Sequence, residues 1–136
     1  MRYFYERILP AQGVYCATGI DTTGRVINVF SESLDELIEH VEQLRDAEVN
    51  VFVAPGSFLN HSRRAENSSH LRSFFIDLDV GKEKAYPSQQ AAIIALDQFL
   101  DRAGLPPPVV VNSGNGVHAY WVFDEDVPAA QWKPYA

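Results

Sequence analysis

The sequence predicts an α/β (α+β) fold in which a mixed or antiparallel sheet carries helices on one side. Short apolar runs of strand length recur along the chain, and two longer stretches repeat apolar residues at helical spacing. Polar segments containing Gly, Pro, Asn and Asp separate these runs. The expected order is β-β-α-β followed by β-α-β-β, and helices that connect strands indicate a layer of helices on a sheet.

The length and composition are those of a globular protein with a single domain and one hydrophobic core. The chain has 136 residues, of which 46% are hydrophobic. The net charge of −7 argues against binding of nucleic acid by bulk attraction, although a local basic groove remains compatible with it. No apolar run reaches membrane-spanning length and no signal peptide is visible. With a single cysteine, Cys16, these features predict a cytoplasmic protein with no membrane partner.

The first half, about residues 1–60, is expected to form a small α/β part. Residues 13–20 and 25–30 are β-like runs on either side of a tight turn. Ser33 and Glu36 have the spacing of a capping box and should begin an amphipathic helix that ends near Glu48. The apolar positions of this helix are Leu34, Leu37, Ile38, Val41 and Leu44.

A short strand at 49–53 precedes a polar stretch at 56–70, which we expect to be a long loop. This loop and the start of the next strand are locally basic. The basic residues are His61, Arg63, Arg64, His70 and Arg72. Arg63, Arg64 or Arg72 are candidates for contacts to phosphate or template, and a plainly solvated loop is the alternative.

The second half, about residues 70–136, is expected to open a ferredoxin-like unit of the kind found in RNA-recognition motifs. Its strands are predicted at 71–79, 109–111 and 117–123, and a helix from Pro87 or Ser88 to Gly104 connects the first two. Residues 124–126 are expected to form a polar break before a third helix near Pro128. Such a unit normally closes with one more helix and strand, so the chain is expected to be truncated.

Two carboxylates lie two positions apart on the strand Phe74–Asp79. Because side chains alternate along a strand, Asp77 and Asp79 should share the face opposite Leu78. Like charges so close repel each other, and a hard divalent cation such as Mg²⁺ or Mn²⁺ would remove that repulsion. The alternative is a strand that simply emerges into solvent at a turn.

A second unusual segment runs from Asn112 to Trp121. Gly114 and Gly116 permit positive φ and close approach of the backbone to a ligand, and their N–H groups could bind an anion. Alternation places His118 on the open face of the sheet, where it can meet Asp77 and Asp79. The alternative is an ordinary hairpin beside a structural histidine.

The segments Phe75-Ile76-Asp77-Leu78-Asp79-Val80-Gly81 and Ser113-Gly114-Asn115-Gly116-Val117-His118-Ala119-Tyr120-Trp121 resemble the first two motifs of the archaeo-eukaryotic primase superfamily. The closest likeness is to primase-polymerases of phages and mobile elements, which are often fused to a helicase. The resemblance implies that Asp77 and Asp79 bind catalytic metal, and that Ser113 and His118 contact nucleotide phosphates at a turn shaped by Gly114 and Gly116. It implies nucleotidyl transfer from NTPs or dNTPs on a DNA template, in primer synthesis or extension.

One departure from that family is plain in the sequence. Its third motif is a further metal-binding aspartate on a later strand, and Asp124, Glu125 and Asp126 follow the histidine strand too closely to supply it. We expect the chain to be the N-terminal portion of a longer enzyme and to have little polymerase activity alone. A non-catalytic nucleotide- or nucleic-acid-binding module, with Phe75 and Tyr120 as stacking platforms, and a metal-dependent nuclease are the alternatives.

Overall fold

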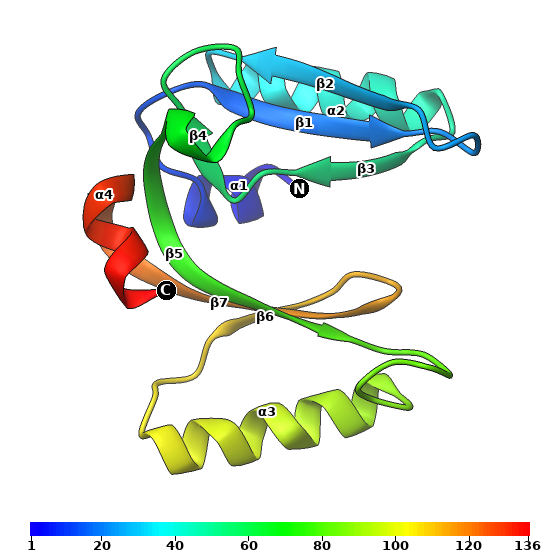
Figure 1. The fold of residues 1–136 in the computed structure, drawn as a ribbon, viewed down its shortest axis with the longest axis vertical. Coiled ribbons are helices and arrows are strands. Elements are labelled where there is room, and N and C mark those ends of the chain that lie inside the picture. Colours follow the sequence, from blue (N-terminus) through cyan, green and yellow to red (C-terminus); the bar gives the residue numbers. More distant parts are fainter. The chain divides into compact units, whose positions relative to one another are not determined.

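The computed structural model describes residues 1–136 and has the predicted mixed α and β composition with antiparallel sheets (Figure 1). The helices are α1 (Arg2–Ile8), α2 (Leu34–Asp46), α3 (Gln89–Ala103) and α4 (Ala129–Trp132), with 3₁₀ turns at Ala65–Asn67 and Lys133–Tyr135. The strands are β1 (Tyr15–Ile20), β2 (Val26–Ser31), β3 (Asn50–Val53), β4 (Gly56–Phe58), β5 (Ser68–Asp79), β6 (Val109–Asn112) and β7 (Gly116–Pro128). No helix has the length and apolar character needed to cross a bilayer.

The chain divides into two compact units. The N-terminal unit comprises residues 1–72 and 123–136, and the central unit comprises residues 73–122. One sheet has the strand order β2-β1-β3 and the other has the order β4-β5-β7-β6. The long strands β5 and β7 each have residues in both units. The last part of β7 and the residues after it, 123–136, belong to the N-terminal unit.

In the N-terminal unit, β1 is the middle strand and pairs antiparallel with β2 and β3. Helix α2 lies along one face of this sheet and buries Leu37, Val41 and Leu44 (Figure 1). Its first residue is set by the predicted cap, because the side chain of Ser33 accepts a hydrogen bond from the Glu36 N–H at 3.1 Å. Glu36 in turn accepts from the Glu32 N–H at 2.8 Å.

Two local predictions for this unit are wrong, and helix α1 is an element that was not predicted. The stretch 56–70, predicted as a loop, contains β4, whose Phe58 exchanges two 2.8 Å hydrogen bonds with Val14. The predicted polar break at 124–126 lies inside β7. Asp126 stays in the strand because its carboxylate accepts hydrogen bonds from the Ala11 N–H and from Arg72. The partners of Val14, Phe58 and Asp126 are distant in sequence, so local patterns carry no sign of them.

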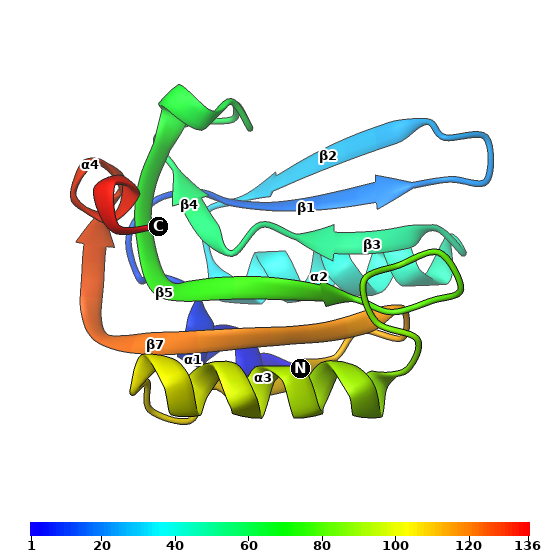
Figure 2. The same ribbon diagram turned by 60° about the horizontal axis from the view of Figure 1, so that its bottom comes forward.

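The central unit has the order β5-α3-β6-β7, with β7 between β5 and β6. Helix α3 covers one face of the three strands (Figure 2). Leu78, Ala92 and Val117 form the core between helix and sheet. The predicted ends of α3 are confirmed, since Ser88 caps it through the Ala91 N–H at 3.1 Å and Gly104 ends it with φ of 64°.

The thiol of Cys16 is expected to be almost unreactive in the folded protein. Its side chain has no exposed surface and packs with Ala54 and Phe58. Burial raises the pKa of this thiol, and a hydrogen bond with Thr18 and the charge of Arg63 oppose that rise only in part. We expect labelling by iodoacetamide at pH 8 to be on the order of a hundredfold slower than in urea. Equal labelling rates with and without urea would contradict the expected protection of the thiol.

Because the pKa of the Cys16 thiol is raised in the folded protein, the free energy of unfolding should fall as pH rises above the ordinary pKa of a thiol.

Candidate functional site

Strand β5 places Asp77 and Asp79 on the face of the central unit that α3 leaves uncovered. Leu78, between them, is 7% exposed and belongs to the core under α3. The side chains of Asp77 and Asp79 are 59% and 61% exposed. The strand alternation inferred from the sequence is therefore present, and both carboxylates are open to a ligand.

His118 extends from β7 on the same face as Asp77. Its Nε2 lies 3.4 Å from Asp77 Oδ1, and its Nδ1 lies 3.3 Å from the hydroxyl oxygen of Tyr120. When the Tyr120 hydroxyl donates to Nδ1, the ring proton is on Nε2 and is directed at the carboxylate. The Asp77 carboxylate only accepts, so it favours the tautomer with the proton on Nε2, and the Tyr120 hydroxyl can donate to Nδ1 in that tautomer.

The turn between β6 and β7 is held by its own backbone and by α3. The Ser113 N–H donates to Gly116 O at 3.1 Å, and Gly114 has φ of 87°, which only glycine adopts freely. Asn112 Oδ1 accepts from the Gly114 N–H at 2.8 Å. The amides of Asn112 and Gln89 also exchange two hydrogen bonds of 2.7 and 2.9 Å, which connect the turn to the first residue of α3.

Gly116 has a different role from Gly114, because it is the point where β7 closely approaches β5. A Cβ atom at Gly116 would lie 2.5 Å from Leu78 O and 3.5 Å from Asp77 Oδ1. Next to it, the Val80 N–H donates to Asn115 O at 3.1 Å. The glycine turn therefore lies directly beside the end of the aspartate strand, and the absence of a side chain at residue 116 allows the two to meet.

Lys84 is a residue of this site that the sequence did not reveal. Its Nζ lies 3.7 Å from Asp79 Oδ2, and both side chains are more than half exposed. Its loop returns to the strand through Gly81 N–H to Tyr86 O and Tyr86 N–H to Asp79 O, at 3.0 and 3.3 Å. The only sequence signal was a lysine in a short link after the aspartates, and links of that kind are usually solvated.

The predicted basic contacts belong to the N-terminal unit. Arg72 Nη1 lies 3.1 Å from Asp126 Oδ1, and Nη2 donates to Asp124 O at 3.4 Å. Its positive charge is thus matched by a carboxylate within its own unit. Arg63 donates to the hydroxyl of Thr18 at 2.7 Å. Of the candidate site residues, the structure brings together Asp77, Asp79, His118 and the turn of Ser113–Gly116.

The donor chemistry of Asp77 and Asp79 fits a hard divalent cation. Mg²⁺ commonly binds one or two carboxylates, keeps several waters and takes its other ligands from substrate phosphates. No group of three or more His, Cys, Asp or Glu side chains in the structure is arranged to hold a metal ion. Asp77 and Asp79 would supply two oxygen donors to such a cation, whose remaining positions would be open to water and phosphate.

Comparison of the chain with protein-family models, with curated proteins and with solved structures found no match. A function has to be inferred from the chain's own residues. Two exposed carboxylates, a histidine that one of them contacts, and the backbone N–H groups of a glycine turn can hold a cation next to a phosphate. That chemistry is shared by enzymes that transfer nucleotides, by nucleases and by proteins that only bind nucleotides.

Proposed function

We propose that the chain carries the metal- and phosphate-binding site of a divalent-metal primase-polymerase, which performs DNA-templated nucleotidyl transfer in primer synthesis or extension. The observation that carries the proposal is the position of His118 Nε2, 3.4 Å from Asp77 on the face that also holds Asp79. The resemblance of the two motifs to those of the archaeo-eukaryotic primases supports it. The partners would be a DNA template and primer, NTP or dNTP, and a helicase.

In the reaction, the 3′-hydroxyl oxygen of the primer forms a bond to the α-phosphorus of the nucleotide. The bond from that phosphorus to the bridging oxygen breaks, pyrophosphate leaves, and the hydroxyl proton passes to water. Asp77 and Asp79 would bind Mg²⁺ or Mn²⁺, which when present neutralises charge on the phosphate oxygens. His118 would donate its Nε2 proton to a phosphate oxygen, and the Tyr120 hydroxyl would donate to Nδ1 of the same ring.

The turn Ser113–Gly116 would position the triphosphate. The N–H groups of Ser113 and Gly114 donate within the turn and hold its shape, so those of Asn115 and Gly116 would be the donors to phosphate oxygens. Lys84 neutralises Asp79 when no cation is bound and would be free to contact phosphate once a cation replaces it. Within residues 1–136, Asp77 and Asp79 are the only carboxylates assigned to metal binding, and no residue is assigned to the third aspartate of the primase motifs.

Metal-dependent nucleotide binding tests this proposal. We expect the chain to bind a fluorescent dNTP in the presence of Mn²⁺, and Asp77→Asn and Asp79→Asn each to weaken that binding at least about tenfold, the typical cost of a lost charged contact. Asp97→Asn is the matched control, because Asp97 is an exposed carboxylate on α3. Loss of binding in all three variants, or in none, would contradict the assignment.

A primer-extension assay with template, labelled dNTP and Mn²⁺ separates the candidate functions. Extension that is weak in the wild type and lost in Asp77→Asn supports nucleotidyl transfer. Nucleotide binding without any extension favours a non-catalytic module, for which the tilted rings of Phe75 and Tyr120, 6.3 Å apart on the same face, are the supporting observation. Degradation of the template without extension identifies a nuclease.

A further inference from the structure

Strand β2 forms one edge of the three-stranded sheet, and its outer side is not paired with another strand (Figure 2). At the start of the β1–β2 ladder the Asp21 N–H donates to Arg25 O at 3.1 Å. Because antiparallel pairs alternate, the odd-numbered residues of β2 are the ones bonded to β1. The N–H and C=O groups of Val26, Asn28 and Phe30 therefore point outward from the edge of the sheet.

The residues of β2 lack the features by which edge strands usually avoid new partners. Natural edges are commonly protected by lysine, by proline or by a β-bulge. The run Val26-Ile27-Asn28-Val29-Phe30-Ser31 contains no charged residue and no proline, and its register with β1 is unbroken. Val26 and Ile27 are 54% and 36% exposed, although both are apolar. A further strand beside β2 would cover them.

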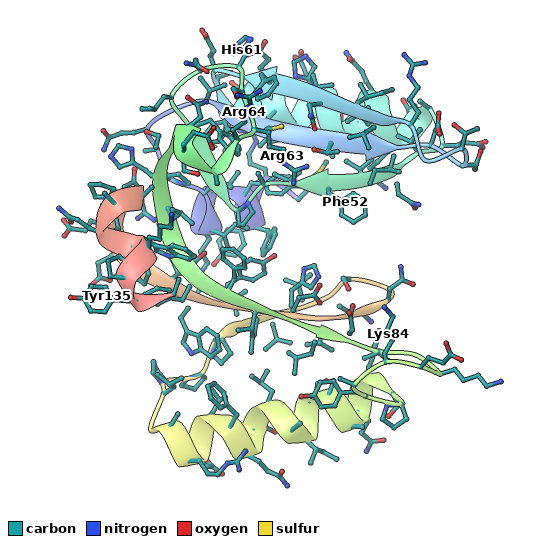
Figure 3. The ribbon with its side chains drawn as sticks, in the orientation of Figure 1. Phe52, His61, Arg63, Arg64, Lys84 and Tyr135 are labelled. Atoms are coloured by element: carbon teal, nitrogen blue, oxygen red, sulfur yellow. The ribbon has the colours of Figure 1, made fainter.

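The other edge of this sheet, β3, offers less to a new strand. It has four residues, and the Ala54 N–H beside it donates to Cys16 O of β1 at 3.0 Å. By the same alternation, only Val51 and Val53 of β3 direct their backbone groups outward. Figure 3 shows the Phe52 side chain, 51% exposed, extending from β3. The longer edge, β2, can form more backbone hydrogen bonds.

The outer edge of β2 is complementary to the same edge of a second copy of the chain. Its outward residues are evenly spaced, with Asn28 in the middle. One antiparallel register keeps all of them bonded: Asn28 faces Asn28 of the second copy across a two-fold axis, and Val26 faces Phe30 of the second copy. In each of these pairs the two residues would exchange both N–H···O bonds. An edge with this symmetry needs no other protein as its partner.

The side chains on the α2 face of the sheet agree with this register. Gly19 of β1 is next to Ile27 in the ladder, and a Cβ atom at Gly19 would lie 2.9 Å from Leu44 of α2, so Ile27 is on the helix side. Across the two-fold axis Ile27 would lie opposite Val29 of the second copy, and such apolar cross-strand pairs stabilise a sheet. Helix α2 contacts all three strands and so lies over the middle strand, β1. The two β1 strands would be about 14 Å apart, which leaves room for both helices.

The opposite face and the ends of the strand agree with it as well. Val26 would pack beside Phe30 of the second copy, whose ring is stacked on His61 with centroids 5.2 Å apart. Arg25 precedes the strand and Glu32 follows it. Antiparallel pairing brings the arginine end of one strand to the glutamate end of the other, whereas parallel pairing would bring like charges together.

We propose that the chain forms a two-fold symmetric dimer in which β2 pairs antiparallel with β2 of a second copy. The pairing joins the two three-stranded sheets into one continuous sheet, with both α2 helices on the same face. Backbone hydrogen bonds fix the register, and the apolar pairs cover the exposed surface of Val26 and Ile27. The interface uses no residue of the central unit and requires no metal or nucleotide. Each copy keeps its own Asp77 and His118, so the dimer is independent of the proposed transfer reaction.

Cysteine cross-linking of the full chain tests the register. In Asn28→Cys the two new thiols would face each other at the two-fold axis, with Cα atoms about 5.5 Å apart, within the range of a disulfide. We expect mild oxidation to convert this variant to a covalent dimer on a non-reducing gel. Val26→Cys is the matched control, because the two Val26 positions would be about 14 Å apart along the strands and should not cross-link. The native Cys16 has no exposed surface and should not contribute.

Sedimentation equilibrium measures the association without any cross-link. We expect the wild type to dimerise with a Kd on the order of 10 µM, and Ile27→Lys to raise that Kd at least about tenfold, because a charge replaces the apolar partner of Val29. Ile94→Lys is the control, since Ile94 is 51% exposed on α3 of the central unit.

Three results would overturn the proposal. One is a wild type that remains monomeric up to about 1 mM. Another is equal cross-linking of Asn28→Cys and Val26→Cys, which would indicate association without a fixed register. The third is cross-linking of Phe52→Cys in place of Asn28→Cys, which would assign the dimer to the edge of β3.

Discussion

Replacing Gly116 by alanine is expected to destabilise the central unit by about 3 kcal/mol, at the upper end of the cost of overpacking. The new methyl carbon would lie 2.5 Å from Leu78 O, which is closer than such atoms approach in proteins. Leu78 O belongs to the backbone of β5 and cannot rotate away, so β5 and β7 must separate. Since Asp77 and His118 are on these two strands, the 3.4 Å contact between them should be lost as well.

Urea unfolding of Gly116→Ala beside Gly114→Ala measures this effect. Gly114 has φ of 87°, and a Cβ atom there would meet no atom within 4 Å, so its replacement should cost only the strain of a left-handed backbone, about 1 kcal/mol. Gly24→Ala, with φ of 83° and equally open space, is the control in the N-terminal unit. A Gly116→Ala variant no less stable than Gly114→Ala would show that β5 and β7 do not approach so closely.

Much of the fold was predictable because its signals are local. Ser33 with Glu36, and Ser88 with Gly104, set the ends of α2 and α3 through atoms a few residues apart. The alternation about Leu78 likewise needs only the periodicity of a strand. The sequence therefore predicted that Asp77 and His118 would share a face, and the structure brings them into contact.

The parts that the sequence did not predict depend on distant partners. Strand β4 exists because Phe58 pairs with Val14, and neither residue carries a sign of the other. Gly114 and Gly116 look alike in sequence, yet one provides a positive φ and the other provides room for the carbonyl of Leu78. Lys84 reaches Asp79 because its loop closes back on the strand.

Replacing Asp126 by alanine is expected to destabilise the N-terminal unit by about 2–3 kcal/mol. This is the range for breaking an ion pair in which one side chain is buried and the other is partly exposed. The Asp126 side chain is 7% exposed and accepts from the Ala11 N–H at 2.8 Å and from Arg72 at 3.1 Å. Its removal leaves the Ala11 N–H without its acceptor and leaves the Arg72 guanidinium, 29% exposed, with only the backbone oxygen of Asp124. Asp124→Ala is the control, because only the backbone oxygen of Asp124 contacts Arg72.

A double-mutant cycle with Arg72→Met identifies what Arg72 does. If its guanidinium serves mainly to hold Asp126, then Arg72→Met with Asp126→Ala should be more stable than Asp126→Ala alone, because no charge is left without a partner. Arg72→Met by itself should lower the urea midpoint and leave Mn²⁺-dependent dNTP binding unchanged at a temperature where the variant is folded. If Arg72→Met instead loses nucleotide binding at a temperature where it is as fully folded as the wild type, the loss cannot come from unfolding. Arg72 would then contact phosphate, as its position in the sequence suggested.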